Sequence, residues 1–257
     1  MGEINIFCSK KFNSNIQCIG YLHAGIFKHQ HSLKRIHNNN YNPDLILTCG
    51  KSSYLELKEN FKNTKIAVED IGCKRYLNIN KFLFIEKNYF QEDICLVLPE
   101  GDIDDLNKFI KFSKSCLKAY PNLKFIIKIH PNMTLEKVKK RYKKFTSNNL
   151  EFSDVSIEKN SLRASFVLYC GSTSIIEAIS FGLLPLYLNN NSDISFDFIY
   201  GLKNINRIIN CKKDFINKIN HYKKINFQKL LNENLNYAKQ IYSPLSKEKI
   251  NNIFNLH

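Results

Sequence analysis

The segment Ser165–Leu188, "SFVLYCGSTSIIEAISFGLLPLYL", carries the signals of one complete strand–helix–strand unit. Short, continuous apolar runs begin and end it, as is typical of strands that are buried on both faces of a parallel sheet. Between these runs, "SIIEAISFG" has a helical pattern that ends at Gly182, and Pro185 follows shortly afterwards, which is typical of a helix end. The segment therefore predicts a βαβ unit.

The same alternation extends from Asp93 to about Asn189 and predicts a Rossmann-like parallel sheet. Asp102 and Thr134 are candidate N-caps of two of the helices in this stretch. Apolar runs predict further strands at 94–98, 123–130 and 150–154, and helical patterns follow them at 102–120, 134–145 and 156–164.

The two ends of the chain have a different character. Weaker strand signals lie in the first eighty residues, at 4–8, 18–23, 44–50 and 65–72, and the chain after Asn189 is mostly helical. We therefore expect an α/β protein with two domains. A shortened N-terminal α/β domain would occupy residues 1–85, and a Rossmann-like domain with terminal helices would occupy residues 86–257.

The composition is that of an ordinary globular protein, with 257 residues of which 44% are hydrophobic. No apolar run approaches the roughly 20 residues that are needed to span a bilayer. The N-terminal sequence lacks the basic flank and apolar block of a signal peptide, and Ile6 stands where a myristoylation site has Ser or Thr. We therefore expect a cytoplasmic protein.

Cysteine usage and charge narrow the classes of partner. The eight cysteines include no Cys-x-x-Cys pair, and Cys49, Cys95 and Cys170 lie in apolar runs, which favours buried thiols over disulfides or a zinc site. The formal net charge of +15 favours anionic partners such as nucleotides or anionic lipid headgroups. The alternative is that the basic residues form an ordinary solvated surface. Without a helix-turn-helix, zinc or RNP signature, we expect no nucleic-acid partner.

Three polar turns follow predicted strands: "PEGD" at 99–102, "HPN" at 130–132 and "GSTS" at 171–174. In a parallel α/β sheet, every strand delivers the loop after its carboxyl end to the same edge, and ligands bind there. We therefore expect these turns to converge on one site although they are far apart in the sequence.

The turn at 171–174 suits a phosphate. Gly171 permits a tight turn, and Ser172, Thr173 and Ser174 then open a helix whose unpaired N–H groups and partial positive charge favour an anion. A purely structural alternative also fits, because Ser174 and Glu177 have the spacing of a capping box. Glu177 could instead hold the hydroxyl groups of a ribose.

The other two turns supply an imidazole and a carboxylate. Pro131 restricts the conformation of His130, so a stiff support presents the imidazole, which could bind a phosphate or a nucleotide. Lys128, two residues earlier, is a candidate second cation. Glu100 could be a base or a ribose ligand, and the alternative is that Gly101 merely forms a turn with the cap that follows it.

Histidines also occur in the N-terminal part. His23 follows a predicted strand and is a candidate general base for an acceptor hydroxyl. His29, His31 and His37 lie in a polar stretch without supporting carboxylates or cysteines, so we expect no metal site. The basic helix at 134–145 could rest on anionic lipid headgroups, or it could be an ordinary surface helix.

The ordered motifs resemble a known family. "IGYLHAG", "PDLILTCG", "IGCKRY", "LVLPEG", "KIHP" and "GSTSIIEAISFGLLPLYL" occur in an order similar to that in bacterial surface-carbohydrate biosynthesis proteins. These proteins are GT-B-type glycosyltransferases, similar in outline to bacterial sialyltransferases and capsule polymerases. The resemblance covers roughly Gly20 to Leu188, and because each motif is short, its specificity lies in the ordered set.

The resemblance implies a GT-B-like fold and a metal-independent glycosyltransferase with a nucleotide-sugar co-substrate and no further cofactor. In the family, the His-Pro and Ser/Thr motifs bind the nucleotide and phosphate of a CMP-sugar donor. Carried over, this implicates His130, Pro131 and the turn Ser172–Ser174. A glycan or a lipid-linked glycan would be the acceptor, with His23 or Glu100 as its base.

Two features depart from the family, and three alternatives stay open. Pro99 precedes Glu100 where the family has a carboxylate pair, and about eighty-five residues are short for an acceptor domain. "HAG" is similar to a motif of CDP-glycerol-type phosphotransferases, while "HPN" with a serine-rich turn and Glu is similar to sugar-nucleotide 2-epimerases. The shortened first domain also fits a non-catalytic nucleotide-binding remnant.

Overall fold

The computed structural model describes residues 16–28, 30–37, 41–80, 93–145, 147–189, 196–203, 206–225 and 227–254. The chain forms two compact units: Met1–Asn80 with Lys239–His257, and Lys81–Ala238. We call them the first and the second unit. The sequence predicts one domain from residue 86 to residue 257, whereas the structure groups the segment from Lys239 with the first unit.

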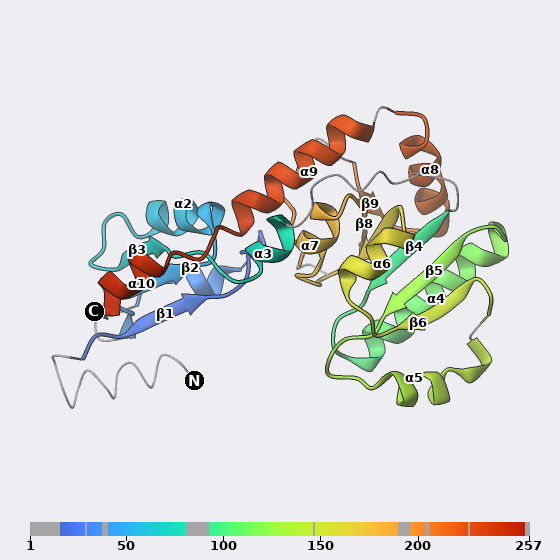
Figure 1. Ribbon diagram of the computed structural model, residues 1–257, viewed down its shortest axis with the longest axis horizontal. Coiled ribbons are helices and arrows are strands. Elements are labelled where there is room, and N and C mark those ends of the chain that lie inside the picture. Colours follow the sequence, from blue (N-terminus) through green and yellow to red (C-terminus); the bar gives the residue numbers. More distant parts are fainter. Residues whose placement is uncertain are drawn as a thin grey trace. The chain divides into compact units, whose positions relative to one another are not determined.

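The second unit contains a six-stranded sheet in which all neighbouring strands are parallel (Figure 1). Its strands are β4 (Ile94–Leu98), β5 (Lys124–Lys128), β6 (Leu150–Ser153), β7 (Phe166–Tyr169), β8 (Leu184–Leu188) and β9 (Ile208–Ile209). Every residue of β4, β7 and β8 is buried, as the continuous apolar runs predicted. The Rossmann-like parallel sheet is therefore confirmed.

The order of the strands across this sheet is β6-β5-β4-β7-β8-β9. Strands β5 and β6 thus follow β4 on one side of it. The chain then crosses to the other side of β4, where β7, β8 and β9 follow in order. Because crossovers between parallel strands are right-handed, this reversal places the helices of the two halves on opposite faces of the sheet. The crevice at such a reversal, beyond the carboxyl ends of the strands, is where open α/β sheets bind ligands.

Two groups of helices cover the sheet, and they are the ones predicted from the periodicity. The helices of the second unit are α4 (Ile103–Ala119), α5 (Leu135–Arg141), α6 (Ile157–Arg163), α7 (Ile175–Ser180) and α8 (Lys212–Tyr222), and α9 (Phe227–Ile241) continues from it into the first unit. Helix α4 packs against α8, where the ring of Phe215 contacts those of Phe112 and Phe125. It also contacts the end of α5, because Tyr142 donates a hydrogen bond to Asn107.

Gly182 ends helix α7, as the sequence pattern predicted. Its φ of 75° is a left-handed conformation that favours glycine. The N–H of Gly182 donates to the carbonyl of Ile179, and the N–H of Leu183 donates to that of Ala178, which is the Schellman arrangement. Helix α7 therefore stops where β8 has to begin.

The first unit contains a three-stranded parallel sheet, β1 (Ile19–Leu22), β2 (Leu45–Thr48) and β3 (Ala67–Asp70), in that order. One face carries a core of Ile26, Leu57, Phe61 and Ile66, contributed in part by α2 (Lys51–Asn60). On the other face, Ile250 and Ile253 of α10 (Lys247–Phe254) pack against Leu45, Leu47 and Ile71. The C-terminal helix thus completes the core of the first unit. The strand predicted at 4–8 lies outside the described residues.

The segment before α10 closes the carboxyl edge of this small sheet. A Cβ atom on Gly50 would overlap with the carbonyl of Ile241, and one on Gly72 would overlap with that of Pro244. The hydroxyl of Ser243 donates to Asp70 and accepts a hydrogen bond from the N–H of Lys51. Close backbone packing and hydrogen bonds therefore hold the C-terminal segment on the ends of β2 and β3.

Three short elements were not predicted: a 3-10 helix at His31–Lys34, α3 at Tyr76–Asn80 and the two-residue strand β9. Among the residues that the structure describes, no helix has the length and apolar character needed to span a bilayer. The buried positions expected for Cys49, Cys95 and Cys170 are confirmed, and the seven described cysteines are all free thiols.

Candidate functional site

The turns after β4 and β7 meet at the point where the strand order reverses. The carboxylate of Glu100 lies against the Cα of Gly171, so closely that a Cβ atom on Gly171 would overlap with Oε1 of Glu100. Glycine at this position therefore follows from the close approach of the two turns. The structure thus brings together the acidic-Gly turn and the start of the hydroxyl-rich turn, which are separated by some seventy residues of sequence.

The turn after β5 joins them. A Cβ atom on Gly101 would lie 3.0 Å from Nδ1 of His130 and 3.3 Å from Nδ2 of Asn132. Such distances are tighter than ordinary packing, so Gly101 lets the imidazole approach the backbone of the β4–α4 turn. The dipeptide Glu100–Gly101 consequently touches the β7–α7 turn with its side chain and the β5–α5 turn with its backbone.

His130 is half-buried and has a defined tautomer when it is neutral. Its Nδ1 accepts a hydrogen bond of 3.2 Å from the backbone N–H of Asn132, and its carbonyl accepts one of 2.9 Å from the N–H of Met133. With Nδ1 acting as an acceptor, the proton of a neutral ring is on Nε2. Nε2 therefore carries the N–H donor of the neutral ring.

The Glu100 carboxyl group has a raised pKa. Burial raises its pKa above the ordinary value of 4.5, and the nearby Asp105 and Asp102 raise it further, while Lys108 acts in the opposite direction. The backbone N–H of Glu100 donates a 2.7 Å hydrogen bond to Asp105, whose own pKa is also raised, chiefly by burial. A raised pKa moves a carboxyl group toward the range that suits general acid–base catalysis.

The β7–α7 turn differs from the capping-box alternative. Ser174 precedes α7 in a helical conformation, with φ −64° and ψ −12°, and its side chain forms no cap hydrogen bond. The structural alternative, in which Ser174 caps the helix through its hydroxyl, is therefore wrong. The turn is closed instead by the N–H groups of Ile175 and Ile176, which donate to the carbonyls of Ser172 and Thr173.

The first residues of this turn are half-buried, and so is Glu177 in the first turn of the helix. Helix α7 has six residues, so its dipole is a minor part of any attraction for an anion. The features of this turn that suit a phosphate are its hydroxyl groups and its position beside Glu100. The assignment of Ser172, Thr173, Ser174 and Glu177 to nucleotide binding stays a prediction.

Two other candidates have different surroundings. Lys128 donates hydrogen bonds to the carbonyls of Ile129, at 3.0 Å, and Asp154, at 3.2 Å, and burial lowers its pKa. Its ammonium group thus holds the ends of β5 and β6, and its role toward a ligand stays a prediction. His23 is exposed directly after β1 in the first unit, and its assignment as a base also stays a prediction.

A buried network beside the site was not foreseen. Asp197 forms an ion pair with Arg207, and the hydroxyl of Tyr169 donates a 2.7 Å hydrogen bond to Asp197. Arg207 also donates to the carbonyls of Leu202 and Ile199. These bonds fix the segment 196–203, whose first residue, Phe196, places its Cβ 3.3 Å from the position of a Cβ on Gly171. No periodicity or turn signal marks these residues in the sequence.

No group of three or more His, Cys, Asp or Glu side chains in the described ranges is arranged to hold a metal ion. His29, one of the histidines considered in the sequence, lies outside those ranges, while His31 and His37 lie in and beside the 3-10 helix of the first unit.

Comparison with solved structures identifies the fold. The chain matches S. aureus MnaA in a co-structure with UDP over 98% of its length, with a TM-score of 0.59 and 15% identity, and spans 71% of that chain. It matches a UDP-N-acetylglucosamine 2-epimerase over 98% of its length, with a TM-score of 0.51 and 11% identity, and spans 69% of that chain.

A third match is a mutant of S. aureus TarM in complex with Fondaparinux, alpha-GlcNAc-glycerol and UDP. It covers 96% of this chain and 52% of the TarM chain, with a TM-score of 0.51 and 16% identity, so this chain spans about half of that protein. These likenesses show the fold, which is the expected α/β, GT-B-like architecture with Rossmann-type parallel sheets. No protein-family model and no curated protein sequence matches the chain.

Proposed function

We propose that the protein is a glycosyltransferase that uses a nucleotide-sugar donor and binds it at the carboxyl edge of the six-stranded sheet. One observation carries the proposal: the turns after β4, β5 and β7 meet where the strand order reverses, through the contacts of Glu100 with Gly171 and of Gly101 with His130. This is the position at which doubly wound sheets bind nucleotides.

In this proposal the phosphate lies between the imidazole and the hydroxyl-rich turn. Nε2 of His130 donates a hydrogen bond to it, with Pro131 restricting the backbone conformation of His130. The hydroxyl and backbone N–H groups of Ser172, Thr173 and Ser174 donate from the other side. These donors stabilise the negative charge that develops on the departing nucleotide, a role that a metal ion has in other enzymes.

The neighbouring residues shape the rest of the site. Gly101 and Gly171 let the turns approach closely, Glu177 accepts hydrogen bonds from ribose hydroxyls, and Lys128 adds positive charge at the end of β5. Glu100, with its raised pKa, exchanges a proton with the reacting groups, or His23 supplies the base for the acceptor hydroxyl. The transfer forms a glycosidic bond to the acceptor oxygen and breaks the bond between the sugar and the nucleotide phosphate.

The resemblance of the motifs to sialyltransferases favours a CMP-sugar donor, whereas the matched structures of MnaA and TarM are complexes with UDP. We propose the cytidine donor, with uridine as the alternative that a binding experiment separates. The acceptor would be a surface glycan or its lipid-linked precursor. The protein would meet it in the cytoplasm, with the basic helix α5 toward an anionic membrane and with no nucleic acid involved.

A second candidate function is that of a sugar-nucleotide 2-epimerase. It is favoured by a structural match, because a UDP-N-acetylglucosamine 2-epimerase matches this chain over 98% of its length with a TM-score of 0.51. The two functions differ in their need for an acceptor. An epimerase converts one sugar nucleotide into another by itself, whereas a transferase releases the free nucleotide.

The test begins with thermal unfolding in the presence of CMP, CDP, UDP or GDP. A ligand at a hundred times its dissociation constant stabilises the folded chain by about 2.7 kcal/mol. We expect a cytidine-selective shift in the wild type and a much smaller one in His130→Ala. The control is His221→Ala, which removes an exposed imidazole from α8.

Incubation with a CMP-sugar and with a UDP-sugar then separates the functions. Release of CMP that depends on His130 supports the transferase, while isomerisation of a UDP-sugar without an acceptor supports the epimerase. Equal nucleotide shifts in the wild type and His130→Ala would contradict the proposed site. Binding without turnover of either donor would favour the non-catalytic remnant.

A further inference from the structure

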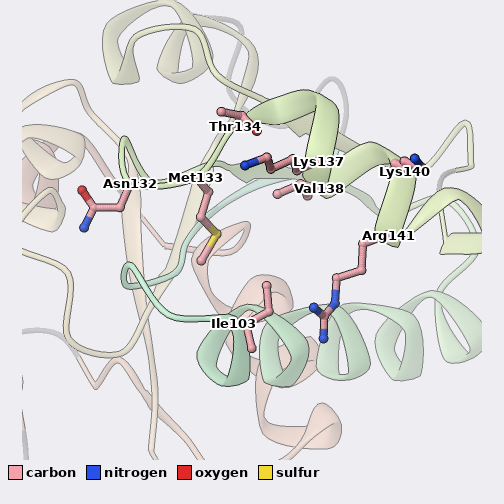
Figure 2. A pocket seen from close by; sticks show the side chains of 8 residues that line it. All are labelled: Ile103, Asn132, Met133, Thr134, Lys137, Val138, Lys140 and Arg141. Atoms are coloured by element: carbon pink, nitrogen blue, oxygen red, sulfur yellow. The ribbon is translucent and has the colours of Figure 1, made fainter.

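A cavity of about 540 Å³ opens between α4 and α5, on the side of the second unit where β4 and β5 end (Figure 2). Its size is within the range of pockets for small organic ligands, roughly 300–1,000 Å³. None of Glu100, His130 and Ser172–Ser174 lines it. It is therefore separate from the candidate donor site, and the inference below does not depend on the proposed function.

The wall of this cavity has an apolar part. Figure 2 shows Met133 reaching from the loop after β5 toward α4, with Ile103 at the start of α4 facing it and Val138 behind them. Val138 is 3% exposed, while Ile103 and Met133 are half-buried. A ligand that covers these side chains would remove apolar surface from water, which is favourable.

The charged part of the wall is entirely cationic. Lys137, Lys140 and Arg141 are its three charged residues, and Figure 2 shows Arg141 extending from α5 across the opening toward α4. Within the described ranges no carboxylate forms an ion pair with any of the three. The guanidinium of Arg141 lies 5.8 Å from the centre of the Tyr142 ring, which leaves its N–H groups available to an anion.

The guanidinium group of Arg141, the ammonium groups of Lys137 and Lys140 and the apolar part of the wall together favour one class of ligand, a phosphate ester. A phosphate monoester carries about two negative charges and accepts hydrogen bonds from several donors, which matches this cation set better than a single carboxylate does. The apolar floor adds a preference for a compact hydrophobic substituent next to the phosphate. A simple inorganic anion would leave that part of the wall uncovered.

We propose that the cavity between α4 and α5 is a second ligand site, which binds a phosphate ester through Lys137, Lys140 and Arg141 and covers its apolar substituent with Ile103, Met133 and Val138. The phosphate ester is either a small metabolite or the headgroup of an anionic lipid. Both present the same group to the cavity, and the experiment distinguishes them.

The loop 132–134 connects this site to the donor site. Asn132, which also lines the cavity, donates its backbone N–H to Nδ1 of His130, and Met133 donates its N–H to the carbonyl of His130. A ligand that moves this loop would change the hydrogen bond that fixes the tautomer of the imidazole. The two sites therefore share one short segment of the chain, and Asn132 lies at both of them.

The test measures binding of phenyl phosphate and of inorganic phosphate to the full chain by calorimetry. Phenyl phosphate should bind more tightly, because only it covers the apolar floor. In Lys137→Gln/Arg141→Gln we expect its affinity to fall by about tenfold or more, as is typical when hydrogen bonds to a charged group are lost. The matched control, Lys139→Gln/Lys144→Gln, removes the same charge from exposed residues that do not line the cavity and should lose less than about threefold.

Co-sedimentation with vesicles of phosphatidylcholine, with and without phosphatidic acid, identifies the source of the phosphate. Binding to phosphatidic acid that is lost in the Lys137/Arg141 variant and kept in the control assigns a lipid headgroup. Absence of vesicle binding, with phenyl phosphate still bound, assigns a small phosphate ester. Equal losses in both variants, or no binding of either probe, would overturn the proposal, because the lysines would then act as an ordinary basic surface.

Discussion

The carboxylate of Glu100 rests on the Cα of Gly171, so that the turn after β4 touches the turn after β7 through this one side chain. This contact joins two strands that are neighbours in the sheet but distant in the sequence. It places the one half-buried carboxyl group of the β4–α4 turn at the start of the hydroxyl-rich turn. The geometry of the candidate site therefore requires a residue without a Cβ atom at position 171.

Gly171→Ala should consequently destabilise the second unit. The new methyl group would overlap with Glu100 and press on Phe196, and we expect a loss of about 1–3 kcal/mol in the free energy of unfolding, as for other overpacked positions. In a Glu100→Ala background, the same change should cost clearly less. Urea unfolding of the four proteins measures this difference.

The control for this experiment is Gly20→Ala in β1, where a Cβ atom would meet nothing within 4 Å. It should have little effect on the unfolding midpoint. An equal cost of Gly171→Ala with and without the Glu100 side chain would show that the close approach is not the cause.

The raised pKa of Glu100 predicts a pH dependence of stability. A carboxyl group whose pKa is higher in the folded chain binds more protons there, so the free energy of unfolding falls as the pH rises from the ordinary value of 4.5 through the raised value. Glu100→Gln removes this penalty. We expect the variant to melt at a higher temperature than the wild type at neutral pH and at about the same temperature below pH 4.

Thermal unfolding across this pH range is the measurement, with Glu136→Gln as the variant that removes an exposed carboxylate. A constant difference between Glu100→Gln and the wild type at every pH would contradict the prediction. In that case, the change in the shape of the side chain, and not the loss of its ionisation, would explain the difference in melting temperature.

The Asp197–Arg207 pair should be a strong determinant of stability. Both side chains are 7% exposed, so Asp197→Ala would leave a buried guanidinium without its counter-ion, and we expect a loss of about 3–5 kcal/mol. The comparison is Glu151→Ala, which breaks the ion pair between Glu151 and Arg163. In that pair the Arg163 side chain is 52% exposed and the Glu151 side chain is 44% exposed. That change should cost less than about 1 kcal/mol. Similar costs in urea unfolding would argue against burial as the deciding factor.

The first unit should depend on its C-terminal helix. Ile250→Ala with Ile253→Ala removes apolar contacts to Leu45, Leu47 and Ile71, and we expect about 1–2 kcal/mol of destabilisation for each half-buried side chain. Hydrogen exchange should accelerate at the amides of β2 and β3 and stay unchanged in β4 and β7. Lys247→Ala, an exposed change in the same helix, is the control. Acceleration in both units alike would contradict the assignment of α10 to the first unit's core.

Much of the second unit could be predicted from the sequence because its signals are local. Apolar runs mark buried strands, Asp102 accepts the N–H of Asp105 as an N-cap, and Gly182 ends α7 in the conformation that glycine favours. The parallel arrangement also implied that the turns after the strands share one edge. The contacts of Glu100 with Gly171 and of Gly101 with His130 agree with that expectation.

The features that escaped prediction depend on pairings between distant residues. The reversal of strand order at β4 and β7 is a property of the whole sheet, and β9 is too short to carry a pattern. Asp197 and Arg207 look like ordinary loop residues until the fold buries them together. The spacing of Ser174 and Glu177 matched a capping box. However, the backbone of Ser174 is already helical, and its hydroxyl forms no cap hydrogen bond.

The division of the first unit between the two ends of the chain sets the order in which the protein is completed during synthesis. The ribosome releases β1, β2 and β3 early, but the helix that covers Leu45, Leu47 and Ile71 emerges only after the whole of the second unit. In the meantime the nascent chain carries an uncovered apolar sheet face, and such exposed surface is prone to aggregation. Until the residues from Lys247 onward have been synthesised, the first unit lacks the helix that completes its core.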